Sequence, residues 1–159
     1  MAILSETTWL RHSNPWSVWT RYAAFPVLVA AIWSYHSIGW WALVPVAAAI
    51  GFLVINPKLF PPPHSTDNWA SKAVLGERVW LKEGRRFLPD QYPKVFYALM
   101  AVSFLNLAAL VWGIIASDVV LTVISTINVL VGKSWSNDRM VWLFSERSRD
   151  NNEYRKWLY

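Results

Sequence analysis

Residues 56–94 read NPKLFPPPHSTDNWASKAVLGERVWLKEGRRFLPDQYPK and form the one long polar stretch between two strongly apolar halves of the chain. Seven of the 15 basic residues lie in it. Each flanking half is long enough for two membrane-spanning helices, because one span needs about 20 predominantly apolar residues. We therefore interpret residues 56–94 as a connection between two membrane-spanning hairpins.

The composition is that of a membrane protein. Hydrophobic residues make up 55% of the 159 residues and charged residues 16%, against roughly 25% charged in an average soluble domain. The 12 tryptophans favour the membrane interface, where the ring is apolar and the N–H stays wet. The chain has no cysteine and its three histidines show no metal-ligand spacing, so we predict no metal site and no cofactor.

The first apolar half is expected to hold two spans. Residues 22–55 contain no Asp, Glu, Lys or Arg, and we place the spans at about 17–35 and 38–55. Asn14 and Pro15 are suited to the cap and first position of the first span. The Asn56-Pro57 pair is expected to end the second.

The second half gives two more spans, at about 95–117 and 119–135, with Asp118 in the turn between them. Residues 136–159 form a polar tail that is expected to be helical. The predicted fold is an all-α integral membrane protein with four spans in one membrane domain, residues 1–159.

A further helix is predicted at about 67–82, inside the polar connection, with candidate N-caps among residues 65–68. On such a helix one stripe carries four residues at helical spacing, namely Trp69, Ala73, Gly76 and Trp80. The stripe suits either the lipid headgroups, with the helix lying on the membrane surface, or the protein's own spans. The sequence leaves both open.

The charges predict a topology. Two basic residues precede residue 56, seven lie in the connection and six follow from Lys133 onward, while the two expected outer turns have none. The positive-inside rule then places the N-terminus, the connection at 56–94 and the tail at 136–159 in the cytoplasm. The same arrangement indicates that the net charge of +5 serves attraction to anionic lipid rather than binding of nucleic acid.

A short motif occurs twice. Glu77-Arg78-Val79-Trp80-Leu81 in the connection is echoed by Asp138-Arg139-Met140-Val141-Trp142-Leu143 in the tail. A duplicated hairpin would produce this echo and could bring basic and aromatic residues together as a docking site for anionic lipid, another anion or a partner. The candidate residues are Lys72, Arg78, Trp80, Lys133, Arg139 and Trp142. The alternative is that these charges set topology and form local ion pairs with Glu77 and Asp138.

The last two spans also share a polar stripe, with candidate residues Ser103, Asn106, Thr122, Ser125 and Asn128. Small and hydroxylated residues commonly hold membrane helices together, and the same residues could line a path for an ion or solute. His36, in the first outer turn, is either an interface residue or a ligand for haem or a chlorophyll magnesium.

Three stretches carry a family resemblance: NPWSVWTR at 14–21, LFPPPHSTDNWASKAVLGERVWL at 59–81 and DRMVWLF at 138–144. They resemble a family of small, uncharacterised four-span proteins of bacteria and archaea. The resemblance implies the same membrane architecture, and we expect the protein in the cytoplasmic membrane of a bacterial or archaeal cell. It brings no activity and no site residues.

Three functions fit these observations. The first is a non-enzymatic accessory or scaffold subunit of a larger membrane assembly, with bound phospholipid, other membrane subunits or further copies of the chain as partners. The second is a small homo-oligomeric channel or transporter that uses the polar stripe. The third is a lipid-headgroup enzyme at the cytoplasmic face, although the sequence selects no catalytic residue among the candidates Asp67, Lys72, Glu77 and Asp138.

Overall fold

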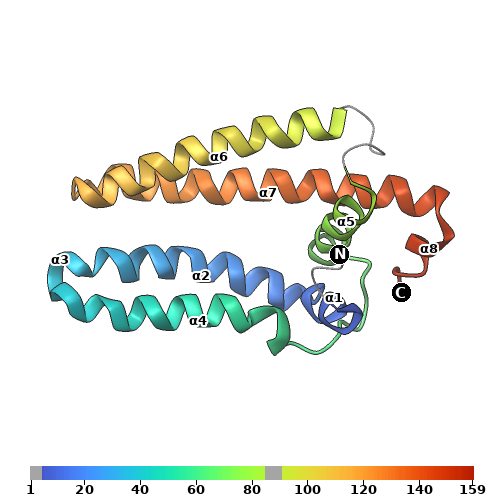
Figure 1. Cartoon of the computed structure of the whole chain (residues 1–159), viewed down its shortest axis with the longest axis horizontal. Coiled ribbons are helices and arrows are strands. Elements are labelled where there is room, and N and C mark those ends of the chain that lie inside the picture. The colour runs from blue at the N-terminus through green and yellow to red at the C-terminus, as the bar shows by residue number, and fades with distance from the viewer. Residues whose placement is uncertain (1–4, 85–90) are drawn as a thin grey trace.

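The computed structural model describes residues 5–84 and 91–159. These ranges are largely helical. The elements, in chain order, are α1 (Glu6–His12), α2 (Pro15–Trp33), α3 (Tyr35–Ile38), the 3₁₀-helix η1 (Gly39–Ala42), α4 (Leu43–Leu59), α5 (Trp69–Glu83), α6 (Gln91–Ile115), α7 (Val119–Asp150) and α8 (Asn152–Arg155). Figure 1 shows two helical hairpins, α2–α4 and α6–α7, with α5 running across one end.

The first hairpin is α2 and α4, which lie side by side and antiparallel (Figure 1). Asn14 caps α2 by accepting a hydrogen bond from the Trp16 N–H at 2.9 Å, and Pro15 is its first residue, as predicted. The chain reverses through α3 and η1, where Gly39 has a φ of +57° that an L side chain rarely adopts.

A buried polar clamp joins α2 to α4. The Ser17 hydroxyl donates to Asn56 Oδ1 at 2.8 Å, and Asn56 Nδ2 donates to the Thr20 hydroxyl at 2.9 Å. Asn56 is fully buried. Helix α4 continues past Asn56-Pro57 to Leu59, so the prediction that this pair ends the helix is wrong. We attribute the difference to the clamp, which holds Asn56 in place although a following proline disfavours helical conformation.

The second hairpin, α6 and α7, packs closely because the residues at the contact are small. A Cβ built on Gly113 would lie 2.8 Å from the Thr122 hydroxyl, and one built on Gly132 would lie 2.9 Å from the Ser103 hydroxyl. Asp118 caps α7 by accepting from the Leu121 N–H. Small residues at these positions let the two helices approach each other.

Three segments of the described chain are long and apolar enough to cross a membrane: Pro15–Leu59, Pro93–Ile115 and Val119–Asp150. The first contains both antiparallel arms of the first hairpin. The predicted boundaries shift accordingly. Residues 35–42 form the reversal rather than span ends, and α7 runs without a break from residue 119 through the predicted tail to residue 150.

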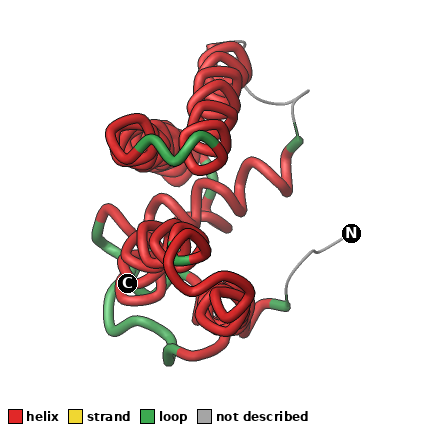
Figure 2. The backbone as a smooth tube through the Cα atoms, turned by 90° about the vertical axis from the view of Figure 1, so that its left-hand side faces the viewer, coloured by secondary structure: helices red, strands yellow, loops and turns green. Residues whose placement is uncertain are grey.

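Helix α5 has two buried faces. Ala70 and Val74 pack with Trp9 and Val18 of α1 and α2, while Leu75 and Val79 pack with α7 residues, including Phe144. Asn68 caps the helix by accepting from the Ser71 N–H at 2.9 Å. Figure 2, turned to look along the hairpins, shows one helix crossing between the two pairs. The stripe of Trp69, Ala73, Gly76 and Trp80 therefore packs largely on the protein itself, the second of the two options that the sequence left open.

The chain end returns to the start of α5. The Thr66 backbone N–H donates to the Tyr159 carbonyl at 2.8 Å, and the Thr66 hydroxyl donates to the Trp157 carbonyl at 2.7 Å. Thr66 is fully buried. Helices α1, α5 and α8 thus gather at one end of the molecule, and the turns of the two hairpins lie at the other (Figure 1).

Candidate functional site

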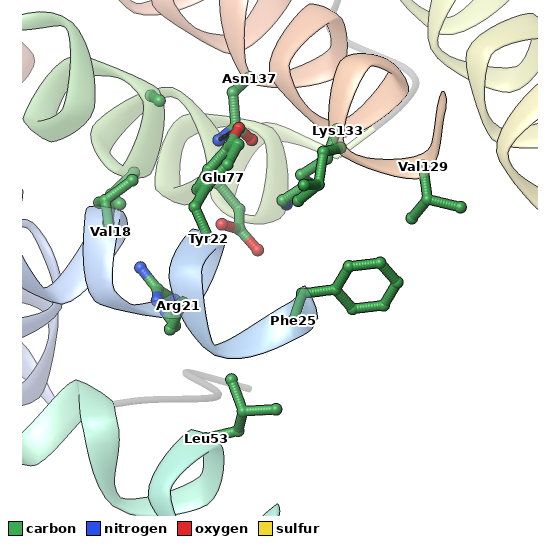
Figure 3. Close-up of a pocket in the computed structure, with 12 residues that line it drawn as sticks. Val18, Arg21, Tyr22, Phe25, Leu53, Glu77, Val129, Lys133 and Asn137 are labelled. Carbon is green, nitrogen blue, oxygen red and sulfur yellow. Dashed lines mark hydrogen bonds between the residues drawn. The ribbon is translucent and has the colours of Figure 1, made fainter. Parts of the chain in front are cut away.

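A cavity of about 300 Å³ lies between the two hairpins, at the end that α5 crosses. Helices α2, α4, α5 and α7 all contribute to its wall. Apolar side chains such as Phe25, Leu53 and Leu130 form most of the lining. Its polar members are Arg21, Tyr22, Glu77, Lys133 and Asn137 (Figure 3). We call these five residues the polar cluster.

Two charges in the polar cluster have no close opposite charge. Within the described residues, neither Glu77 nor Lys133 makes a salt bridge within 4.0 Å. Both side chains are accessible from the cavity. Arg21 and Glu77 attract each other electrostatically at longer range, so Lys133 is the cation with the least compensation. Such a charge beside an apolar wall is suited to a phosphate or carboxylate.

Arg21 is held in place by groups behind the cavity. Its Nε donates to the Ser17 carbonyl at 2.9 Å and its Nη1 donates to His12 Nε2, also at 2.9 Å. Because arginine is always a donor, His12 Nε2 must accept, and the proton of the neutral ring sits on Nδ1. That leaves Arg21 Nη2 without a hydrogen bond to a described residue, and hence available to a ligand.

His12 is buried, with 8% of its surface exposed. Burial, reinforced by the charges of Arg21 and Lys133, lowers the pKa of His12 from 6.5 to about 3. The ring is therefore neutral at physiological pH and adds no positive charge. Its Nδ1 is buried without a hydrogen-bond partner in the described structure, which is unfavourable, while Nε2 accepts the hydrogen bond from Arg21.

Asn137 and Tyr22 link α7 to α2 at the cavity wall. Asn137 Nδ2 donates to the Tyr22 hydroxyl at 3.1 Å. This bond spans 115 residues of sequence and joins one hairpin to the other. It keeps α2 and α7 in register at the point where the polar cluster meets the apolar part of the cavity.

An apolar groove continues from the cavity along α2 and α7. It has a volume of about 410 Å³ and is lined by residues such as Val29, Trp33, Val123 and Ile127. Leu130 lines both the cavity and the groove, so the two are neighbours. Together they form an amphipathic site with charge at one end and hydrocarbon along the rest.

A smaller cavity of about 190 Å³ lies on the other side of the polar cluster. It is bordered by Trp80 of α5, Phe96 of α6 and Met140 of α7. Glu77, Lys133 and Asn137 line this cavity as well as the larger one. These three residues therefore stand between two spaces, one bordered by α2 and one bordered by α6.

The predicted docking residues do not gather in one place. Lys72 pairs with Asp67, and Arg78 pairs with Glu6 while stacking 3.9 Å from the Trp157 ring. Arg139 pairs with Asp138 at 2.9 Å and lies 4.6 Å from the Trp142 ring. Trp80 packs on Phe96 with ring centroids 4.6 Å apart. Of the six, only Lys133 lines the inter-hairpin cavity. The local ion pairs agree with the alternative reading, except that the partner of Arg78 is Glu6 and not Glu77.

The polar stripe divides between a helix contact and an outer face. Ser103, Thr122 and Ser125 lie at the packed side of α6 and α7, and Thr122 and Ser125 are buried. Asn106 donates to the Val102 carbonyl of its own helix at 2.9 Å. Asn128 is exposed on α7. At this contact, Ser103 and Thr122 lie against glycines of the facing helix.

His36 ties the two hairpin turns together. Its Nε2 lies 3.0 Å from the Ile114 carbonyl, which can only accept, so Nε2 donates. The Ser117 hydroxyl lies 3.4 Å from Nδ1. Both ring nitrogens thus have a partner within the described chain.

Sequence reasoning did not assign Arg21, Tyr22, Glu77 and Asn137 to a common site. It treated Glu77 as a partner in a local ion pair. One signal was present, because Lys133 and Asn137 are four residues apart and share a helix face. The crossing of α5 between the hairpins, which brings Glu77 to that face, has no signature in the sequence.

The fold and site thus define an all-helical protein with membrane-length apolar segments and an amphipathic cavity between two hairpins. The chain belongs to a family of unknown function, DUF6653, whose family model matches residues 2–156. No curated protein and no solved structure matches it. The expected membership of an uncharacterised family is confirmed, while the family's name implies no activity.

Proposed function

We propose that this chain is a non-enzymatic four-span membrane protein that holds an anionic phospholipid between its two hairpins. We further propose that it serves as an accessory or scaffold subunit of a larger membrane assembly. One observation carries the lipid proposal. The polar cluster, with Lys133 and Arg21, stands at the end of an apolar groove that runs along α2 and α7.

Four spans follow if α2 and α4 each cross the bilayer. They contain 19 and 17 residues, or about 28 and 26 Å of helix, close to the hydrocarbon thickness of about 30 Å. Helix α6 and the first half of α7 supply the other two. The 32 residues of α7 span about 48 Å, so its second half extends out of the bilayer.

The distribution of charge supports cytoplasmic termini. The turns at the α3 end contain Asp118 and no basic residue, whereas the described basic residues lie toward the end crossed by α5. The positive-inside rule then puts α1, α5 and α8 on the cytoplasmic side. Exposed tryptophans stand at both ends, including Trp16 and Trp135 at one and Trp40 and Trp41 at the other, as expected for side chains at the two membrane surfaces.

The lipid would sit with its phosphate at Lys133 and Arg21 Nη2 and one acyl chain in the groove. From Leu130 to Val119 the groove follows α7 for 11 residues, about 17 Å, which is most of the length of one chain. Glu77 offsets Arg21, so a singly charged phosphate diester would neutralise Lys133. A charge-assisted contact in this partly desolvated place is stronger than the same contact in water.

Native mass spectrometry tests this proposal. The protein is purified gently and exchanged into nanodiscs that contain equal amounts of phosphatidylglycerol and phosphatidylcholine. We expect the wild type to retain phosphatidylglycerol and Lys133→Gln to retain several-fold less. Lys58→Gln is the control, because Lys58 is an exposed cation on α4, away from the cavity. Equal retention by the two variants would contradict a role for Lys133.

The groove has its own test. Val123→Trp places a large ring in the groove, whereas Val120→Trp adds the same ring to an exposed position that does not line it. We expect lipid retention to fall for Val123→Trp and to be unchanged for Val120→Trp. A wild-type protein that retains no lipid would overturn the lipid proposal as a whole.

The accessory role draws support from the outer surfaces of both hairpins, which are apolar and available to other membrane helices. We expect larger proteins to co-purify with the chain from native membranes, and isolation as a lone monomer would count against the role. The channel alternative has less support, because Ser103 and Thr122 pack against glycines of the facing helix.

A further inference from the structure

Asn128 lies on α7, within an apolar run, and is exposed. Within the described chain its amide makes no hydrogen bond. Neighbouring polar side chains behave differently. Asn106 donates to the Val102 carbonyl, Thr126 to the Thr122 carbonyl and Ser134 to the Leu130 carbonyl. Unlike these residues, Asn128 has no hydrogen-bond partner within the described chain.

An unpaired amide facing hydrocarbon is unfavourable, because lipid tails offer neither a donor nor an acceptor. The side chain cannot escape to water easily. Asn128 is nine residues from the start of α7 at Val119, which places it about 14 Å along the helix. That is close to the middle of a hydrocarbon layer about 30 Å thick.

The residues around Asn128 form a regular helix face. Ile124, Val131 and Trp135 are all more than half exposed, at 51%, 55% and 56%. With Asn128 they are spaced four, three and four residues apart, which is the spacing of a helix–helix seam. This seam lies on a different side of α7 from Thr122 and from Val123 of the groove, and its edge at Asn128 adjoins the α6 contact made by Gly132.

We infer that a second copy of this chain packs on the α7 seam of Ile124, Asn128, Val131 and Trp135, with the two Asn128 amides hydrogen-bonded to each other. Copies inserted in the same orientation carry Asn128 at the same depth, so a two-fold axis along the membrane normal brings the two residues together. An amide suits this role because it has both a donor and an acceptor. A different partner would need its own polar group at that depth.

Cysteine cross-linking tests the seam directly, since the chain has no cysteine of its own. Val131→Cys places a thiol on the seam. Leu105→Cys is the matched control, being 71% exposed but on α6. The two positions lie about 18 and 15 Å along their helices from the turn between α6 and α7. In oxidised membranes we expect a disulfide-linked homodimer for Val131→Cys, at least five times more than for Leu105→Cys.

The amide is then tested in the Val131→Cys chain. Asn128→Leu keeps a similar size but removes the hydrogen bonds, and we expect cross-linking to fall several-fold. Asn128→Gln retains an amide and should preserve most of it. Circular dichroism and thermal unfolding in detergent confirm that the variants remain folded, because Asn128 contributes no hydrogen bond within the described monomer.

Three results would overturn the inference. They are equal cross-linking at Val131→Cys and Leu105→Cys, dimer formation unaffected by Asn128→Leu, or a disulfide formed only with a different protein. The lipid measurements above are separate from these readouts. Loss of the dimer with retained phosphatidylglycerol would leave the proposed lipid binding intact.

Discussion

Gly76 of α5 lies directly against the backbone of Met140 in α7. A Cβ built on Gly76 would fall 2.0 Å from the Met140 carbonyl oxygen and 2.9 Å from its Cα. Any side chain at this position would force the two helices apart. The close approach lets Leu75 and Val79 reach the core around Phe144, and it brings Glu77 to the cavity beside Lys133.

Gly76→Ala should therefore destabilise the protein even though alanine favours helix. Overpacking a tight contact typically costs about 1–3 kcal/mol, and here the neighbour is backbone that cannot rotate away. Thermal unfolding in detergent measures the loss. Gly51→Ala is the control, because a Cβ at Gly51 meets nothing within 4 Å. A Gly76→Ala protein as stable as Gly51→Ala would mean that α5 does not cross α7 this closely.

Asn56→Leu should weaken the first hairpin. The substitution leaves the Ser17 hydroxyl without its acceptor and the Thr20 hydroxyl without its donor in the α2–α4 interface. Leaving a buried polar group unpaired costs about 1–3 kcal/mol. Chemical denaturation in mixed micelles should show the effect. The double variant Ser17→Ala with Asn56→Leu should recover part of the loss, and failure to recover would argue against the clamp.

The stability of the protein should depend on pH through His12. Its pKa in the folded state, about 3, is below the unfolded value of about 6.5. Above pH 6.5 His12 is neutral in both the folded and the unfolded state, and its contribution to stability is complete. As the pH falls from 6.5 toward 3, only the unfolded chain gains the proton, so stability declines by up to about 1.4 kcal/mol per pH unit.

His12→Gln should flatten this decline, because glutamine does not titrate and its oxygen can accept the Arg21 hydrogen bond. Unfolding free energies of the two proteins are compared between pH 7 and pH 4.5. Identical pH profiles for His12→Gln and the wild type would refute the assignment.

Arg78→Lys should loosen the C-terminal segment. The Arg78 guanidinium lies 3.9 Å from the centre of the Trp157 ring and also pairs with Glu6. Lysine keeps the charge but lacks the planar group, and a cation over an aromatic ring contributes about 0.5–2 kcal/mol. Limited proteolysis should cut the segment after α7 faster in this variant. Arg149→Lys, at an exposed position of α7, is the control and should be cut at the same rate as the wild type.

Much of the helix pattern was predictable from local sequence. Charge-free runs indicated the apolar helices, Asn14-Pro15 predicted the start of α2, and residues 65–68 contained the cap of α5. These features depend on neighbours in sequence, such as an N-cap side chain that reaches a backbone N–H two or three residues away. The continuation of α4 past Pro57 was not predictable, because a contact with α2, far along the chain, decides it.

The sequence by itself determined the helical class of this protein, its membrane-length apolar segments and the segregation of its charges. Each of these depends only on composition and on the order of apolar and charged residues along the chain. Only the tertiary structure decided which residues share a site. Arg21, Glu77 and Lys133 lie on three different helices and meet because Gly76 permits α5 to cross α7. The polar connection that divides the sequence is therefore also the element that joins its two hairpins, through contacts between residues far apart in the chain.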